Sequence, residues 1–339
     1  MGIATMIRII LVMLLVVLTG QAHAMQFKIA TLSPDGTVWM QKMREGASEL
    51  AKKTDNRVQI KYYPGGVMGD DKTVLRKIRI GQLHGGAVVS GSLTKYYPDN
   101  QIYSLPLKFK SFEEVDYVRK FLDQRIVDGL EKGGFVTFGI AEGGFAYVMS
   151  DVPILTVEKM RKQNVWIPDN DPTLLEAIKA FGVNPIPLSI ADVRAGLQTG
   201  LINTVASPPI GAVALQWHTQ IKYLTNEPFL YIYGLLAVDR KAFEKISPFD
   251  QRVFREIMGR VFRDLDRLNR QDNVKALEAL RKQGIEFVKV PAESLIEWLK
   301  HASAVPRRLI ETGRLSREMV DTLENLLKDY RSKHSEADE

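Results

Sequence analysis

Short apolar strands alternate with amphipathic helices along most of this chain, and that alternation most constrains its fold. Residues 26–32, 58–64, 86–90 and 135–142 have the composition of strands, and the segments between them carry apolar residues at helical spacing. Strands that are separated by helices require crossover connections, which place helices on both faces of the sheet. The sequence therefore predicts an α/β protein with a largely parallel sheet.

The second half of the chain repeats this style without repeating the sequence. Two further strand–helix pairs are predicted between residues 164 and 199, and Asp171 before Pro172 is predicted to cap the first of these helices. In the first of these strands, Val165 and Ile167 alternate onto one face and Trp166 onto the other. The run 221–238 is rich in β-forming residues, and Pro228 interrupts it. Such a segment is long enough to cross from one lobe of the protein to another.

A chain of 339 residues is longer than one hydrophobic core usually serves, so two lobes are predicted. Pro248 opens a helix that Gly284 ends, roughly 50 Å long at 1.5 Å per residue. A helix of that length exceeds one lobe and is expected to brace both. We predict a first lobe of 25–147 plus about 236–270, a second of 148–235 plus about 271–330, and a frayed tail over 331–339.

The N-terminus has the organisation of a secretory signal peptide, predicted to cover residues 1–24. Arg8 precedes the apolar run 9–18, and Ala22-His23-Ala24 supplies small residues for cleavage after Ala24. The apolar run is too short to span a membrane, and no second run of that length follows. The chain has no cysteine, which excludes a lipoprotein anchor and disulfides. We expect a periplasmic protein.

Residue patterns that would indicate catalysis are missing. The five histidines show no metal-ligand spacing, and neither a G-x-S-x-G elbow nor a Walker A loop occurs. The glycine-rich stretch 64–72 places Asp70 and Asp71 at a predicted helix N-terminus, where their negative charges would repel a phosphate. A structural turn is therefore predicted there.

The net charge of +6 is spread over the chain, and the basic cluster 76–79 is interpreted as a solvated helix face. We therefore expect no enzyme activity, no cofactor, no metal and no nucleic-acid partner. A two-lobed exported protein of this kind suits closure on a small solute.

Nine stretches in order along the chain resemble the periplasmic solute-binding subunit of TRAP transporters, the DctP-type family: SPDGTVW, YPGGVMGDD, GAVVSGSL, SLPLKF, EGGFAYVMS, FGVNPIPL, ADVRAGLQTG, QIKYLT and ISPFDQRVF. The resemblance implies a type II periplasmic-binding-protein fold, with two α/β lobes, crossing strands and a long bracing helix. It also implies delivery of an organic acid to a small and a large membrane subunit, driven by an ion gradient.

The polar anchors that the family uses for its substrate are replaced in this chain. Trp166 occupies the slot of the arginine that usually grips the substrate carboxylate, and Ala146 occupies the slot of a second arginine. Ser207 stands where the family has an asparagine, and residues 202–204 read INT in place of VDG.

Three interpretations follow. The site binds an organic acid through another anchor, for which Arg194 is the leading candidate; or it binds a neutral or aromatic ligand on which Trp166 stacks. In the third, transport of the usual kind is lost, and the protein serves as the partner of a membrane sensor or as an orphan. The predicted ligand-binding residues are Trp166, Ser207, Ala146, Phe145, Arg194, Ser90, Glu142, Tyr231 and Trp217.

Overall fold

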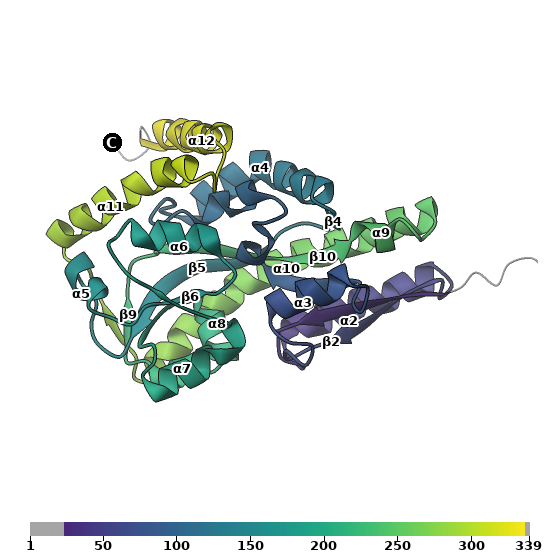
Figure 1. The fold of residues 1–339 in the computed structure, drawn as a ribbon, viewed down its shortest axis with the longest axis horizontal. Coiled ribbons are helices and arrows are strands. Elements are labelled where there is room, and N and C mark those ends of the chain that lie inside the picture. The colour runs from purple at the N-terminus through teal and green to yellow at the C-terminus, as the bar shows by residue number, and fades with distance from the viewer. Residues whose placement is uncertain (1–23, 336–339) are drawn as a thin grey trace, which may run out of the picture.

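The computed structural model describes residues 24–335, so the signal peptide lies almost entirely outside the described part. Helices surround a mixed sheet in two lobes, which confirms the predicted α/β fold class (Figure 1). The strands are β1 (Met25–Thr31), β2 (Val58–Tyr63), β3 (Gly85–Val89), β4 (Phe135–Val136), β5 (Ala141–Ser150), β6 (Trp166–Pro168), β7 (Ile186–Leu188), β8 (Thr204–Ser207), β9 (Tyr223–Thr225), β10 (Leu230–Asp239) and β11 (Glu286–Val288).

The α-helices follow the apolar periodicity that the sequence shows. They are α2 (Val38–Lys53), α3 (Asp71–Arg79), α4 (Phe112–Lys132), α5 (Val157–Arg161), α6 (Pro172–Lys179), α7 (Val193–Thr199), α8 (Pro209–Ala214), α9 (Arg240–Phe243), α10 (Pro248–Lys282), α11 (Ala292–Glu311) and α12 (Arg317–Ser335). Short 3-10 helices are η1 (Ser90–Leu93), η2 (Pro98–Ser104), η3 (Ile190–Asp192) and η4 (Trp217–Gln220). No described helix is long and apolar enough to cross a bilayer.

The sheet runs in the order β11-β9-β5-β10-β3-β1-β2, and only part of it is parallel. In the first lobe β1 pairs in parallel with β2 and β3. β10 runs antiparallel to β3 and β5, and β5 runs antiparallel to β8 and β9. The expectation of a largely parallel sheet is therefore wrong in the middle of the molecule, where two long strands connect the lobes in opposite directions.

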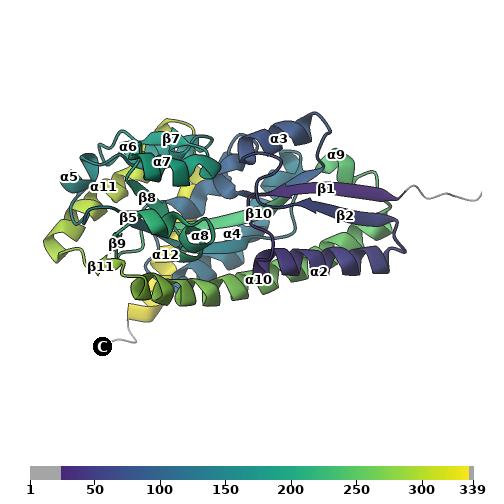
Figure 2. The same cartoon turned by 90° about the horizontal axis from the view of Figure 1, so that it is seen from below.

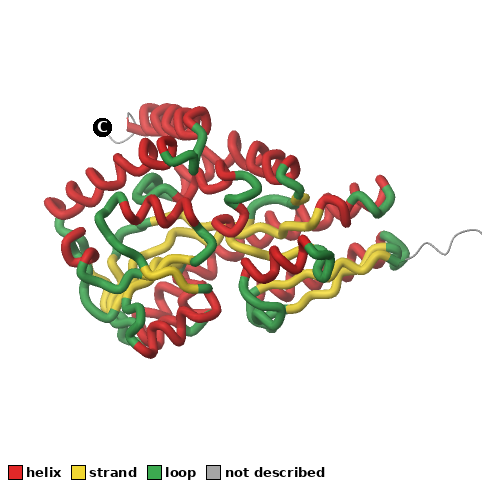
Figure 3. Tube along the Cα trace, in the orientation of Figure 1, coloured by secondary structure: helices red, strands yellow, loops and turns green. Residues whose placement is uncertain are grey.

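β5 and β10 are the strands that cross between the lobes (Figure 3). The crossing predicted for 221–238 is confirmed, and Pro228 falls in the break between β9 and β10. The strand predicted over 135–142 is instead divided between β4 and β5, because Gly139 between them has a positive φ of 123°. A register shift at Ile232 and Tyr233 further bends the crossing pair.

The long bracing helix is α10, which runs beneath both lobes in Figure 2. Ser247 caps it by accepting a hydrogen bond from the Asp250 N–H, and Pro248 occupies its first turn. Val261 packs in the core beneath β1 and β2, whereas Leu280 packs in the core of the second lobe. One helix therefore contributes to the cores of both lobes.

The last described residues of the chain are helical. α12 continues to Ser335 and lies beside α4, where the Arg331 guanidinium donates to the buried Glu114 carboxylate at 2.7 Å. This ion pair joins the last turns of α12 to α4. Residues 336–339 lie outside the described part, and the fraying of the tail stays a prediction. The proposed lobe boundaries stay predictions.

Candidate solute-binding site

A cavity of about 250 Å³ lies between the two lobes and takes walls from both. Ser90 and Gly91 reach it from the first lobe, at the end of β3, and Trp166 and Asp171 reach it from the second. β6 and α6 hold the latter pair at the edge of the short β6–β7 sheet. Four of the predicted residues line this cavity: Ser90, Trp166, Ser207 and Trp217.

Two indole rings form one wall of the cavity. Trp166 and Trp217 pack edge to face, with ring centroids 5.1 Å apart. The Trp166 Nε1–H donates to the Leu188 carbonyl of β7 at 3.0 Å, so β7 fixes the orientation of the ring. Val165 and Ile167 pack in a different core from Trp166, as strand alternation predicts. The role of Trp166 as a ligand contact stays a prediction.

The two serines bring hydroxyl groups to the cavity. The Ser90 Oγ accepts a hydrogen bond from the Gln101 amide at 3.2 Å, and Asn100 donates to the Ser90 carbonyl at 2.8 Å. The Ser207 Oγ donates to the Pro208 carbonyl at 3.0 Å. Each hydroxyl is thus held in place by a neighbouring group while its residue faces the cavity.

Asp171 is a cavity residue that the sequence indicated only as a helix cap. Its Oδ1 accepts from the Leu174 N–H at 2.8 Å, as predicted for an N-cap before Pro172. Burial raises the pKa of Asp171 to about 6. Its Oδ2 lies so close to Gly91 that a Cβ there would be 2.1 Å away. The lobes therefore meet at a point where no side chain fits.

A second cavity of about 600 Å³ adjoins the first, and Val89, Gly143 and Ile210 line both. Asp71 lies on its wall and accepts from the Val89 N–H at 3.0 Å and the Ser92 hydroxyl at 2.9 Å. Burial raises the pKa of Asp71 to about 6. Within the described chain, neither cavity has a lysine, arginine or histidine in its lining. The charge in this cleft is acidic.

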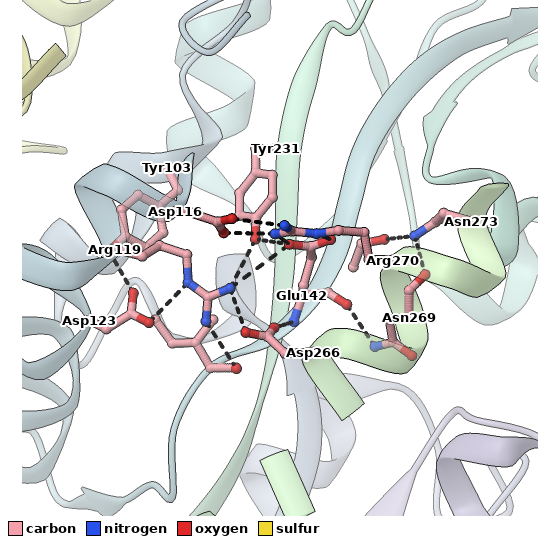
Figure 4. A network of polar contacts seen from close by, with 12 residues as sticks. Tyr103, Asp116, Arg119, Asp123, Glu142, Tyr231, Asp266, Asn269, Arg270 and Asn273 are labelled. Atoms are coloured by element: carbon pink, nitrogen blue, oxygen red, sulfur yellow. Dashed lines mark hydrogen bonds and ion pairs between the residues drawn. The ribbon is translucent and has the colours of Figure 1, made fainter. Parts of the chain in front are cut away.

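Glu142 lines the second cavity rather than the first, and its role as a ligand contact stays a prediction. Its side chain is fully buried, where the Tyr231 hydroxyl donates to it at 3.0 Å and Arg270 donates to both of its oxygens, at 3.1 and 2.5 Å (Figure 4). Arg119 lies 4.0 Å away. The hydrogen bonds that Arg270 donates to Asp116 and Glu142 raise the pKa of Arg270. The Glu142 carboxylate of β5 therefore balances the positive charges of Arg119 on α4 and Arg270 on α10.

Three other predicted residues on the crossing strands line neither of the two cavities. Phe145 packs against Phe112, with ring centroids 4.8 Å apart, and against Tyr231 at 5.8 Å. The Tyr231 hydroxyl is committed to Glu142. Ala146 is paired with Leu230, which does line the cavity, but the alanine is itself fully buried.

Arg194 is also outside the cavity. It lies on the exposed side of α7 and donates to the Gln216 side chain. The structure therefore gives no support to Arg194 as a replacement anchor. No cluster of histidine and acidic side chains suited to a metal ion occurs among the residues described.

Two α/β lobes joined by crossing strands, with a cavity walled by both, define a two-lobed solute-binding protein. The family model for bacterial extracellular solute-binding protein, family 7, matches residues 29–312, and the chain belongs to this family. The family consists of solute-binding proteins rather than enzymes.

Curated relatives are distant. The chain is 25% identical over 264 residues to the C4-dicarboxylate-binding periplasmic protein DctP of Rhodobacter capsulatus, covering 74% of this chain and 76% of the relative. It is 24% identical over 211 residues to the uncharacterized protein YiiZ of Salmonella typhimurium, covering 60% of this chain and spanning 63% of that protein.

Solved structures share the fold. A TRAP periplasmic solute-binding protein from Xanthobacter autotrophicus with bound β-D-galacturonate superposes with a TM-score of 0.80 at 18% identity, covering 89% of this chain and 99% of that one. One from Desulfovibrio salexigens with bound orotic acid gives a TM-score of 0.81 at 17% identity, covering 90% and 99%. These similarities confirm the type II periplasmic-binding-protein fold.

Proposed function

We propose that this protein captures a small organic solute between its lobes in the periplasm and delivers it to the small and large membrane subunits of a TRAP-type transporter. The observation that carries the proposal is the cavity walled by both lobes, in a chain that the family model matches over residues 29–312. Export would use residues 1–24, with cleavage after Ala24.

An organic acid is the first candidate for the solute. Structures of the same fold contain galacturonate, orotic acid and L-gulonate. In this chain the carboxylate would be held by neutral donors such as Ser90 and Ser207, because no basic side chain lines the described cavities. An acid bound in this way gains less from each contact than one gripped by an arginine.

A neutral or aromatic solute is the second candidate, and the composition of the cavity wall favours it. Trp166 and Trp217 offer ring surface on which a planar solute can stack. Asp171 supplies an acceptor for a hydroxyl or an amine.

Calorimetric titration of the mature chain with sugar acids and with neutral aromatics separates these candidates. A solute at about 100 times its dissociation constant should raise the free energy of unfolding by about 2.7 kcal/mol. Gly91→Ala is the control, because its Cβ would collide with Asp171 when the lobes meet. A solute that binds this variant as tightly as the parent is not enclosed between the lobes.

The membrane protein with which this protein works distinguishes a transport function from a sensing function. Proteoliposomes that contain the two membrane subunits should accumulate the solute only when this protein is added. Native mass spectrometry should recover the solute chemically unchanged, and its conversion would contradict a binding role. Solute-dependent binding to a membrane sensor kinase, without accumulation in the proteoliposomes, would favour the receptor interpretation.

A further inference from the structure

A separate hollow of about 780 Å³ lies beyond the contact between the lobes. Gly91 and Asp171 face the solute cavity, whereas Ser92 and Asn170, next to them in the chain, face the hollow. The Asn170 amide donates to the Ser92 Oγ at 2.9 Å across the lobes. The hollow is therefore divided from the solute cavity by this pair of turns.

The hollow collects positive charge from both lobes. It is lined by five basic side chains and two acidic ones. Lys72 pairs with Asp169 at 3.3 Å, and Asp70 caps α3 by accepting from the Thr73 N–H at 2.8 Å. The remaining basic residues, which form no ion pair with any residue that the structure describes, are Arg76, Arg79, Lys95 and Arg314.

Two hydrogen-bonding groups at this wall have no partner among the residues that the structure describes. Thr173 is only 4% exposed, and its Oγ1 makes no hydrogen bond within the described chain. The buried Nε of Arg314 is likewise without an acceptor among these residues. Buried polar groups are nearly always satisfied in native proteins, and an acceptor bound at this wall would satisfy both groups.

We propose that this hollow binds a small anion with at least two negative charges, of the phosphate or pyrophosphate type. Concave surfaces of one sign focus the electrostatic field and concentrate ions of opposite charge. Guanidinium groups on α3 suit multidentate binding of such an oxyanion, and the volume suits a small ligand. Arg76 and Arg79 belong to the basic cluster that the sequence assigned to a solvated helix face.

The anion would contact both lobes, because α3 and Lys95 belong to the first lobe and Thr173 belongs to α6 of the second. A ligand that contacts both sides of an interface stabilises the arrangement in which the two sides meet. Binding of the anion is therefore linked to contact between the lobes, whatever solute the cleft accepts.

Isothermal titration of the mature full chain with inorganic pyrophosphate tests the proposal. We expect one saturable site whose affinity falls as salt rises. Arg76→Gln with Arg79→Gln should weaken binding about 10-fold or more, since charge-assisted hydrogen bonds are lost. The matched control is Arg252→Gln with Arg263→Gln, which removes two exposed arginines of α10 that form no ion pair within residues 24–335 and should change the affinity less than about twofold. Equal weakening by both double variants, or no saturable binding by the parent, would overturn the proposal.

Thr173→Val tests whether the anion lies at the inner wall of the hollow, beside Thr173, rather than at its rim. Because the hydroxyl has no partner in the described chain, the variant should keep its melting temperature while pyrophosphate binding weakens about 2- to 10-fold. An unchanged affinity would overturn the placement of the anion beside Thr173.

Sedimentation with phosphatidylglycerol vesicles, against phosphatidylcholine vesicles, identifies the source of the anion. Vesicle binding that the Arg76 and Arg79 changes abolish assigns a lipid headgroup. Binding of pyrophosphate alone assigns a free anion.

Discussion

Replacing Glu142 by glutamine would remove the central negative charge of the buried network in Figure 4 while keeping the shape of the side chain. Glu142 is fully buried and receives hydrogen bonds from Tyr231 and Arg270. A glutamine can still accept from Tyr231, but its amide would point N–H groups at a guanidinium. The substitution therefore leaves cationic groups incompletely neutralised in the interior.

The expected loss follows from the partners that remain. Breaking a buried ion pair from one side costs about 3–5 kcal/mol. Arg119 keeps Asp266 at 2.8 Å, and Arg270 keeps Asp116 at 2.8 Å, so neither arginine becomes isolated. We therefore expect the lower end, a fall of about 3 kcal/mol in the free energy of unfolding. That loss corresponds to an increase of roughly 100-fold in the unfolding constant.

Asp116→Asn is the matched control, because it removes the same charge from the same Arg270 at the surface. The Asp116 side chain is 48% exposed, so its pair should contribute about 1 kcal/mol or less, and added salt should screen that contribution. Urea unfolding at about 0.05 M and 0.5 M NaCl measures both variants. A Glu142→Gln loss below about 1 kcal/mol, or one that salt removes as fully as the Asp116→Asn loss, would refute this account of the network.

Gly91→Ala should weaken solute binding by about tenfold or more in calorimetry while changing the urea midpoint little, because its Cβ obstructs Asp171 only where the lobes meet. Burial raises the pKa of Asp171 from 3.8 to about 6, so the folded state holds the proton more tightly than the unfolded state. The parent should therefore lose up to about 3 kcal/mol of stability from this group as pH rises from about 4 to 6. Asp171→Asn should remove that part of the pH dependence in urea unfolding. The part that comes from Asp71, whose pKa is also raised to about 6, should remain in this variant. Trp166→Phe should lower the free energy of unfolding by about 1 kcal/mol, because the hydrogen bond to Leu188 is lost, yet keep solute affinity within about threefold. Trp166→Ala should lower both the free energy of unfolding and the solute affinity.

Local signals predicted the elements that depend on local physics. Asp171-Pro172 and Ser247-Pro248 identified two helix starts, because a cap and its acceptor lie within one turn. The placement of Trp166 at the cavity followed from strand alternation beside its buried neighbours. Such features need no knowledge of distant parts of the chain.

The same alternation failed on β5. Simple alternation puts Glu142 and Ala146 on one face, but Gly143 is skipped in the pairing with β10. Glu142 therefore pairs opposite Tyr233, and Phe145 opposite Tyr231, on a shared face. The sequence does contain the cause, two adjacent glycines, although it does not show how they pair.

The partners of Glu142 could not be predicted either, because they lie far along the chain. Arg270 is 128 residues away, and the sequence holds 46 basic residues with nothing to single it out. Asp171 was recognised as a cap, but its position against Gly91 depends on how two lobes meet. Contacts of this kind are set by tertiary packing rather than by local pattern.

The cavity wall is held by hydrogen bonds to the backbone, and this explains how the family scaffold can persist while its polar anchors change. The Asn273 amide of α10 donates to the Gly143 carbonyl at 2.7 Å and accepts from the Ile210 N–H at 3.1 Å. Gly143 and Ile210 line both cavities, so one side chain of the bracing helix positions the crossing strand and the start of α8 together. Because these bonds use peptide groups, they do not depend on which side chains stand at Trp166 or Ser207. The solute chemistry can therefore change at the cavity surface while the backbone that forms its wall stays in place.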